Sequence, residues 1–286
     1  MTYRDYLDRA DTELKKAGIE DHSSCARLIV CEASGMNMAA VILHEHEEVS
    51  EAYVKRFEEL LSRRLEREPL EYITGHTSFM GLEIICTPDC LIPSFDTEIL
   101  AEIAVNEAKK ALREAGSKET VRLLDICTGT GCVGISVAKL SGIGKVTLSD
   151  ISPEVIRVAE KNAAENGVEA ELIVSDLFEA IEGKYKLITA NPPYIAGGMI
   201  ETLAPEVSVF EPRLALDGGA DGLSFYRRIV MGAPEYMDEG AFLAMEIGDE
   251  QAEEVGDMMK ERGFEQITVH KDLAGFNRVV SGFWKG

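Results

Sequence analysis

The sequence predicts an α/β protein preceded by a small helical domain, and the residue pattern supports this in two regions. From residue 95 onward, short apolar runs typical of strands alternate with segments of helical periodicity, which favours a mostly parallel sheet with helices on both faces. About the first seventy residues have helical periodicity alone. We therefore expect a helical bundle at 1–76, a β-hairpin linker at 77–94 and an α/β domain at 95–286.

The helical domain should contain three main helices. In each, apolar residues recur on one side, and glycine or proline follows where the helix should stop. Ser24 is the expected N-cap of the second helix, because a serine hydroxyl can accept a hydrogen bond from a free backbone N–H. The expected helices cover residues 3–17, 24–35 and 50–67.

The linker has the pattern of a short strand pair. Leu82, Ile84 and Cys86 occupy every second position, as they would on one face of a strand. Pro88-Asp89 supplies a turn signal, and a further apolar pair follows it. The pattern predicts a β-hairpin within 79–93 that turns at Pro88-Asp89.

Seven strands can be placed along the α/β domain. Asp96 is the expected N-cap of its first helix. The expected strands cover 121–126, 146–149, 172–174, 187–190, 242–247, 266–270 and 279–283, and further helices are expected at 133–140, 153–166, 222–231 and 249–262. Only about eight residues separate the last two strands, which is too few for a helical crossover, so this pair should be antiparallel.

Composition argues against several classes of function. The chain has 286 residues, is 45% hydrophobic and carries a formal net charge of −22. So acidic a protein repels a phosphate backbone, which disfavours DNA or RNA as its main substrate, and it would suit a basic protein partner. The sequence has no run of about 18 apolar residues and no secretory signal, so we expect a cytoplasmic protein that does not bind a membrane.

Cysteine and histidine spacing gives no sign of a metal site. The six cysteines form no Cys-x-x-Cys pair, and His44 and His46 have no partner at metal-ligand spacing. We therefore expect no bound metal, and reduced, mostly buried thiols.

The first candidate site is a glycine-rich turn between a strand and a helix. Gly129, Gly131 and Gly134 have the spacing of the dinucleotide fingerprint, and glycine lets a ligand approach the backbone N–H groups that start the helix. Asp150 ends the next strand, near the position of an acid that binds ribose hydroxyls. Asp176 follows the third strand, where a carboxylate can accept a hydrogen bond from an adenine amino group. These residues predict a nucleoside-bearing cofactor without specifying which one.

The second candidate site is Asn191-Pro192-Pro193-Tyr194, directly after the apolar strand at 187–190. An amide nitrogen is a poor nucleophile because its lone pair is delocalised, so an enzyme that methylates it must hold and orient that nitrogen. The Asn191 side-chain oxygen and the Pro192 carbonyl can each accept one N–H of an NH2 group. The two prolines stiffen the loop, and the Tyr194 ring can stack on a flat substrate group.

Several further segments form a combination that is specific to one family. Together with Asn-Pro-Pro-Tyr, they resemble the release-factor glutamine methyltransferases, the PrmC/HemK family, from about Leu61 to the C-terminus. The segments are Glu68-Pro69-Leu70-x-Tyr72-Ile73-x-Gly75, Leu91-Ile92-Pro93-Ser94-Phe95-Asp96-Thr97-Glu98, Phe210-Glu211-Pro212-Arg213-Leu214-Ala215-Leu216, Gly218-Gly219-x-Asp221-Gly222-Leu223 and Asp272-Leu273-Ala274-Gly275.

The resemblance implies a Rossmann-like methyltransferase that uses S-adenosylmethionine, releases S-adenosylhomocysteine, and methylates the Gln of the Gly-Gly-Gln motif in bacterial class-one peptide-chain release factors. It implies that the helical domain helps to dock the release factor. The residues expected to bind the cofactor are Cys127, Thr128, Gly129, Thr130, Gly131, Asp150, Ile151, Asp176, Leu177 and Asn191. The residues expected to bind the glutamine are Asn191, Pro192, Pro193 and Tyr194, with Asn191, Pro192 and Tyr194 as the catalytic ones.

Two departures from the family pattern affect these expectations. The family usually has glycine where Cys127 stands, so the turn here is less permissive. It also usually has Arg-Pro where Ser94-Phe95 stand, so a positive charge that could serve local ion pairing or cofactor contacts is missing here.

Three other functions fit part of the sequence. An adenine amino-group methyltransferase on DNA or RNA would share the cofactor and Asn191 to Tyr194, but it would need a basic groove and a way to extract a base. A nicotinamide-dependent oxidoreductase would explain the glycine turn alone. A catalytically silent adaptor would keep the fold, although the Asn-Pro-Pro-Tyr motif is intact.

Overall fold

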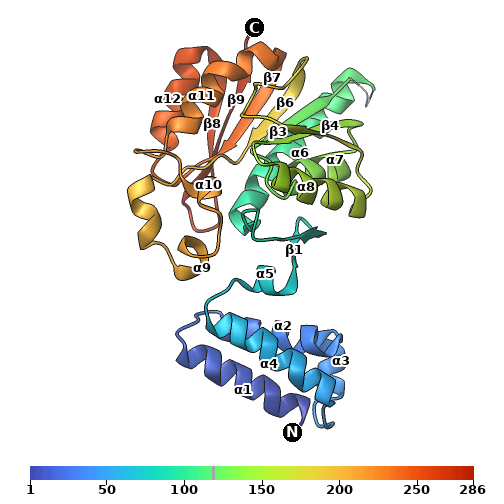
Figure 1. Cartoon of the computed structure of the whole chain (residues 1–286). Coiled ribbons are helices and arrows are strands. Elements are labelled where there is room, and N and C mark those ends of the chain that lie inside the picture. The colour runs from blue at the N-terminus through green and yellow to red at the C-terminus, as the bar shows by residue number, and fades with distance from the viewer. Residues whose placement is uncertain (118–119) are drawn as a thin grey trace. The chain divides into compact units, whose positions relative to one another are not determined.

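A computed structural model describes residues 1–117 and 120–286 and divides the chain into two compact units (Figure 1). The helical unit comprises Met1–Gly75 together with Ala204–Phe210. The α/β unit comprises His76–Leu203 and Glu211–Gly286. A short stretch that follows the Asn-Pro-Pro-Tyr motif in sequence therefore belongs to the helical unit.

The helical unit is built around aromatic side chains. Tyr6, Tyr53 and Phe57 are buried, and the Tyr6 ring meets the other two edge to face. Its helices are α1 (Tyr3–Lys16), α2 (His22–Ser34), α3 (Met38–Leu43), α4 (Glu51–Leu65), α5 (Leu70–Thr74) and α9 (Pro205–Ser208). Sequence reasoning predicted α1, α2 and α4, and it missed the short α3, α5 and α9.

The predicted start of α2 is wrong. The N-cap is Asp21 and not Ser24, which lies in the first turn of the helix. Asp11 of α1 accepts hydrogen bonds from the side chains of His22 and Ser23. This tertiary contact draws those two residues into the helix, so helical geometry begins before the serine that local pattern favoured.

The linker does form a hairpin, but its turn lies elsewhere. β1 (His76–Phe79) pairs with β2 (Leu82–Ile85) in antiparallel register, and Met80 and Gly81 both have positive φ at the turn. A two-residue turn of this kind matches the twist of a hairpin. The alternation at 82–86 therefore marks the second strand and not the first. Pro88-Asp89 does form a turn, closed by the Cys90 N–H donating to the Thr87 carbonyl at 3.0 Å, but it is not the turn of the hairpin.

The α/β unit contains a seven-stranded sheet in the order β5-β4-β3-β6-β7-β9-β8. Neighbouring strands are parallel from β5 to β7, whereas β9 is antiparallel to both β7 and β8, so the predicted antiparallel final pair is confirmed. The strands are β3 (Arg122–Ile126), β4 (Lys145–Asp150), β5 (Ala170–Val174), β6 (Tyr185–Ala190), β7 (Met237–Glu246), β8 (Phe264–Lys271) and β9 (Asn277–Trp284).

Helices cover both faces of this sheet, because successive strand residues point to opposite sides. Leu123 packs with α6 (Phe95–Ala115), α7 (Cys132–Ser141) and α8 (Pro153–Glu165), whereas Leu124 packs with α11 (Ser224–Gly232) and α12 (Ala252–Arg262). Figure 1 shows these two groups of helices on either side of the sheet. The remaining short helices are η1 (Gly197–Thr202), α10 (Arg213–Leu216) and η2 (Ala233–Tyr236).

The start of α6 also differs from expectation. Ser94 is the N-cap, and its hydroxyl accepts a hydrogen bond from the Thr97 N–H, while Asp96 lies in the first turn. An acid in the first turn is stabilised by the helix dipole without capping, so both residues fit the helix start. Within residues 1–117 and 120–286, none of the helices combines the length and apolar character that a membrane crossing needs.

The topology places a crevice at the carboxyl ends of the central strands. From β3 the chain moves outward through β4 to β5, and it then returns to place β6 on the other side of β3. Loops that leave β3 and β6 diverge at their carboxyl ends, and ligands bind at such switch points in open α/β sheets. Both sequence motifs singled out above follow one of these two strands.

Candidate active site

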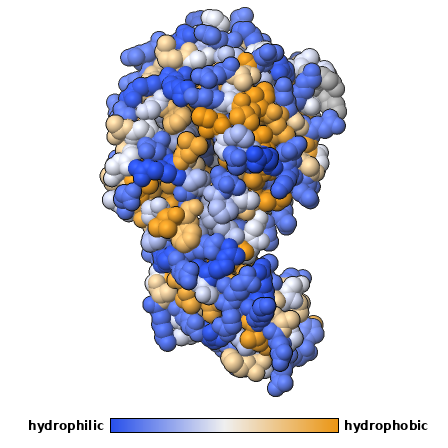
Figure 2. Space-filling model, viewed as in Figure 1, coloured by the Kyte–Doolittle hydropathy of each residue, from blue (hydrophilic) through white to orange (hydrophobic). Residues whose placement is uncertain are grey.

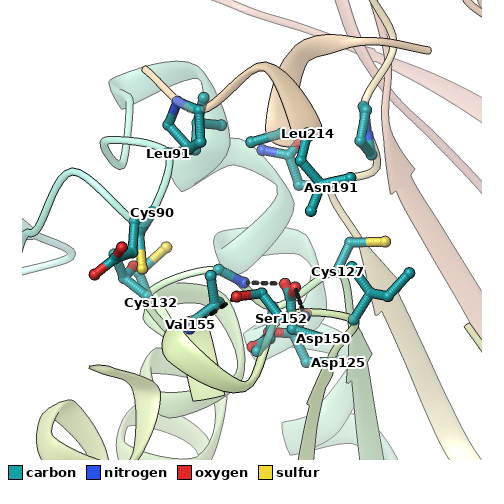
Figure 3. A pocket seen from close by; sticks show the side chains of 18 of the residues that line it. Cys90, Leu91, Asp125, Cys127, Cys132, Asp150, Ser152, Val155, Asn191 and Leu214 are labelled. Carbon is teal, nitrogen blue, oxygen red and sulfur yellow. Dashed lines mark hydrogen bonds between the residues drawn. The ribbon is translucent and has the colours of Figure 1, made fainter. Parts of the chain in front are cut away.

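A cavity of about 360 Å³ opens at this switch point, within the α/β unit. That volume is within the range of small-molecule sites. Most of its lining is apolar, including Leu91, Ile151 and Leu214, and Figure 2 shows apolar surface gathered on this face of the unit. In the view of Figure 3, Asn191 and Leu214 border the cavity on one side, and Asp150 and Ser152 border it on the other.

The glycine-rich turn forms the floor of the cavity. Gly129 and Gly131 have φ values of 55° and 83°, in the left-handed region that glycine adopts without strain. Cys127 also has positive φ, at 55°, which explains why glycine is usual at this position in the family that the sequence resembles. Burial and the nearby Asp150 carboxylate raise the pKa of the Cys127 thiol well above its usual value, so this side chain is a neutral thiol.

Asp125, the fourth residue of β3, holds this turn from beneath. Its carboxylate accepts hydrogen bonds from the hydroxyls of Thr128 and Thr189, each at 2.6 Å, and from the Gly134 N–H at 3.1 Å. Burial raises the pKa of Asp125 to about 6, although these three hydrogen bonds oppose the shift. Gly134 must be glycine because a Cβ there would lie 2.3 Å from Cδ2 of Leu148 and 3.1 Å from Cβ of Asp125.

Asp150 faces the turn from the end of β4. Its Oδ2 accepts a hydrogen bond from the Gly129 N–H at 3.1 Å, and its Oδ1 accepts one from the Ser152 N–H at 3.2 Å. Burial raises the pKa of Asp150, and these backbone N–H groups oppose the shift. Each carboxylate oxygen retains a lone pair for a further donor, such as a ribose hydroxyl.

Asp176, after β5, pairs with a residue that sequence reasoning missed. Arg228 of α11 donates from Nη2 to Asp176 Oδ1 at 2.8 Å, and both side chains line the cavity. Phe225, one turn earlier on α11, lines the same part of the wall. The pair leaves Asp176 Oδ2 able to accept a hydrogen bond from a bound ligand, while Phe225 supplies an aromatic surface.

The Asn-Pro-Pro-Tyr loop contributes Asn191 and Pro193 to the cavity wall. Asn191 donates from Nδ2 to the Thr97 hydroxyl of α6 at 3.3 Å. Pro192 is buried, and Tyr194 is half-buried with its hydroxyl 3.5 Å from Oε1 of Glu246. Of the residues predicted for the site, all except Gly131, Pro192 and Tyr194 line the cavity.

Sequence reasoning missed three polar residues beside the predicted ones, namely Thr97, Arg228 and Glu246. Thr97 belongs to a segment that carries the family resemblance, but nothing local connects it with Asn191, 94 positions away. Glu246 had a usable signal, because it interrupts the apolar run 241–247 and an acid there must be buried. Arg228 lies on an amphipathic helix and has no distinguishing pattern.

Family profiles match both units of the chain. The PrmC N-terminal domain profile matches residues 5–75, and the methyltransferase small domain profile matches residues 96–221. The release factor glutamine methyltransferase of Geobacter sulfurreducens is 36% identical over 282 residues, which cover 98% of this chain and 96% of that protein. The protein of the same name from Agrobacterium fabrum is also 36% identical, over 96% of this chain and 95% of its own length.

Solved structures share the fold at lower identity. The hMettl16 catalytic domain, in complex with the MAT2A 3'UTR hairpin 1, superimposes with a TM-score of 0.55 at 17% sequence identity. The match covers 72% of this chain and 75% of that one. At this identity the likeness concerns the methyltransferase fold alone.

Proposed function

The chain belongs to the release factor glutamine methyltransferase family, and we propose that it methylates the side-chain amide nitrogen of the Gln in the Gly-Gly-Gln motif of bacterial class-one peptide-chain release factors. The methyl donor would be S-adenosylmethionine, and S-adenosylhomocysteine would be the second product. One observation carries the proposal. Asn191 lies in the wall of the cavity that Asp150 and the glycine turn border, and its Nδ2 is hydrogen-bonded inward to Thr97.

This arrangement suits an amide nitrogen as the group that receives the methyl better than it suits a nucleophile that needs a general base. Because Nδ2 is engaged by Thr97, the Asn191 Oδ1 is left to accept an N–H from the substrate. Pro192 and Tyr194 lie next to the lining residues Asn191 and Pro193 and not in the lining itself. From there the Pro192 carbonyl would accept the other N–H, and Tyr194 would cover the flat face of the amide. Two acceptors fixed in space prevent rotation of the NH2 group and orient its lone pair, which is the main help that an unreactive nitrogen needs.

The cavity residues suit the cofactor. S-adenosylmethionine supplies a methyl group on a positively charged sulfur that is a good leaving group. Cys127 to Gly131 would enclose its methionine part, with backbone N–H groups and the start of α7 facing its carboxylate. Asp150 and Ile151 would hold the ribose, and Asp176 and Leu177 would hold the adenine. The lone pairs that remain on Asp150 and Asp176 support these two assignments.

The helical unit, predicted from sequence as residues 1–76, would help to dock the release factor in the cytoplasm. The net charge of −22 favours a basic protein as the partner and disfavours direct binding to nucleic acid. Adenine-containing DNA and RNA are therefore the competing substrates to include in any assay.

The decisive test is mass spectrometry of a class-one release factor after incubation with the enzyme and S-adenosylmethionine. We expect one added methyl group on the Gln of Gly-Gly-Gln, and none on DNA or RNA. Methylation of nucleic acid alone would overturn the proposal.

Asn191→Ala tests the role of the loop. We expect turnover to fall by at least about 10²-fold, because one of the two acceptors that orient the nitrogen is lost. The dissociation constant for S-adenosylmethionine should stay within about threefold in titration calorimetry. Asn106→Ala is the matched control, because Asn106 is exposed on α6 and lies away from the cavity lining. Full turnover by Asn191→Ala would show that its carboxamide does not hold the substrate.

A further inference from the structure

Glu246 is a buried carboxylate directly behind the Asn-Pro-Pro-Tyr loop. It ends β7, and the register Ala190↔Met245 places it level with Asn191 at the same edge of the sheet. Its relative exposure is 3%, and its Oε2 has no hydrogen-bond partner of ordinary geometry among the described residues. Burying an ionised carboxylate away from water costs free energy unless neighbouring groups stabilise its charge, so the groups around Glu246 determine its state.

The Thr97 hydroxyl lies between Ser94 and Asn191, and one pattern of hydrogen bonds satisfies all three side chains. Ser94 accepts a hydrogen bond from the Thr97 N–H, so its own hydroxyl hydrogen is available for Thr97 Oγ1, 3.0 Å away. Thr97 Oγ1 also accepts from Asn191 Nδ2 at 3.3 Å. When Ser94 donates to Thr97, both lone pairs of Thr97 Oγ1 are occupied, and its hydroxyl hydrogen is free to point toward Glu246. Glu246 Oε1 lies 3.5 Å from the Tyr194 hydroxyl, and the Thr97 and Asn191 side chains lie near enough to lower the pKa of Glu246.

This network fixes which end of the Asn191 carboxamide faces the cavity. An ionised carboxylate can only accept hydrogen bonds, so it draws N–H and O–H groups inward. Asn191 Nδ2 donates one hydrogen to Thr97, and the nearby Glu246 carboxylate favours an N–H over a carbonyl oxygen on this side of the carboxamide. Oδ1 of Asn191 has no hydrogen bond within the described part of the chain, and it is the end left for a substrate N–H.

We propose that Glu246 is a positioning residue, which acts through Thr97 and Asn191 to keep the Asn191 oxygen turned toward the substrate amide. The inference rests on the proposed function for what the oxygen binds. It deepens that function, because it names the group that selects an NH2 donor and rejects the opposite orientation of the asparagine. Ser94 completes the network with a hydroxyl, at a position where the family usually has arginine.

The charged and titratable groups around Glu246 come from five elements. They are Asp96 of α6, Cys132 of α7, Tyr194 of the loop after β6, Tyr226 of α11 and Arg278 of β9. Arg278 is held by Asp96 at 3.2 Å and Asp272 at 2.8 Å, so its charge is shared and does not compensate Glu246 alone.

The balance of these effects makes the charge of Glu246 change near neutral pH. Burial raises its pKa to about 7, the Asp96 charge adds to the rise, and Thr97, Arg278 and Asn191 oppose it. As the pH falls through 7, Glu246 gains a proton and becomes a donor. It then competes for the Thr97 oxygen, and the Asn191 carboxamide is free to turn its NH2 toward the substrate NH2.

The first test is the pH dependence of methyl transfer to a release factor by the full-length enzyme. We expect kcat/KM to fall about 10-fold between pH 8 and pH 6, as it does when one group with a pKa near 7 must be ionised. Glu246→Gln should have a lower plateau and a flat profile over this range, with unchanged affinity for S-adenosylmethionine. Glu253→Gln is the matched control, because Glu253 is exposed on α12, and it should keep the wild-type profile.

The hydroxyl of Thr97 gives a second pair of variants. Thr97→Val should lower kcat about 10-fold with little change in KM, because the amide is misoriented and not lost. Thr97→Ser restores the hydroxyl and should recover most of the activity. A Glu246→Gln enzyme that keeps the wild-type dependence on pH, or a wild-type profile that is flat, would overturn the inference.

A readout without turnover separates this inference from the proposed function. The side-chain NH2 resonances of Asn191, identified by their loss in Asn191→Asp, should shift with a midpoint near pH 7 in the wild type and stay constant in Glu246→Gln. If they titrate while no release factor is methylated, the positioning network stands and the proposed function fails. If methylation occurs but these resonances ignore pH, the network is wrong and the function stands.

Discussion

Gly134 offers a sharp test of how the cofactor turn is packed. It lies in the first turn of α7, and a Cβ at this position would lie 2.3 Å from Cδ2 of Leu148. Carbon atoms pack at about 3.5–4.0 Å, so an alanine here overlaps a buried leucine by more than about 1 Å. It would also lie 3.2 Å from Oδ2 of Asp125, the oxygen that accepts the Gly134 N–H.

A second helical glycine supplies the comparison. Gly256 lies within α12, and the nearest atom to its added Cβ is Cγ2 of Ile267 at 3.9 Å, an ordinary contact. Alanine in place of glycine inside a helix is favourable by about 1 kcal/mol, so Gly256→Ala should stabilise the protein by about that amount. Gly134→Ala has the same favourable helix contribution of about 1 kcal/mol, but overpacking in a core costs about 1–3 kcal/mol. Because the added methyl overlaps atoms on two sides, we expect an overpacking cost of about 2–3 kcal/mol, which leaves the variant less stable by about 1–2 kcal/mol.

Urea unfolding and calorimetry of the two full-length variants measure the difference, expected at about 2–3 kcal/mol from the two estimates above. Gly134→Ala should also bind S-adenosylmethionine more weakly, because Asp125 holds the turn through the Gly134 N–H. Gly256→Ala should bind it as the wild type does. Equal stability of the two variants, with equal cofactor affinity, would refute the close packing derived for α7.

Two other substitutions test single contacts. Cys127 has positive φ, a conformation that costs an L-residue about 1–2 kcal/mol, and Cys127→Gly removes this cost. Cofactor affinity measured by calorimetry should therefore be unchanged or tighter in this variant. A loss of affinity above about 10-fold would mean that the thiol itself contacts the ligand. Glu206→Gln should destabilise the helical unit by about 1–3 kcal/mol in hydrogen exchange of α4, because Glu206 accepts from Arg64 at 3.1 Å and Arg67 at 2.8 Å. Burial raises the pKa of Glu206, but its backbone and arginine hydrogen bonds lower it by more, so the net pKa is below its usual value of 4.5. The carboxylate therefore stabilises the fold above pH 4.5, and the difference in stability between wild type and Glu206→Gln should disappear as the pH falls below that value. A stability difference that persists at low pH would argue against this ion pair.

Local patterns identified most of the elements and both motifs. The strands of the sheet followed from apolar runs, and the antiparallel final pair followed from the short connection before β9. Glycine spacing located the turn after β3, and a polar loop after a buried strand located Asn191. Such features depend on residues that are neighbours in the chain, so the sequence carries them directly.

Element starts and the hairpin register were harder to predict, and the reason is physical. Ser24 and Asp96 are acceptable caps by local chemistry, yet contacts to Asp11 and the geometry of Ser94 begin their helices earlier. The apolar alternation at 82–86 has the same appearance whether its partner strand comes before or after it. Only pairing with His76–Phe79 decides between the two.

By itself, the sequence determined a mostly parallel sheet, a glycine turn after its first strand and a polar loop after the strand that ends at Ala190, because those depend on short-range periodicity and turn chemistry. Only the tertiary structure decided what surrounds Asn191. Thr97 and Glu246 reach it from α6 and β7, and Arg228 reaches Asp176 across 52 positions. A carboxylate on a solvated loop is an ordinary acid, whereas burial at the end of β7 raises the pKa of Glu246 to about 7, because it removes the water that would stabilise the charge.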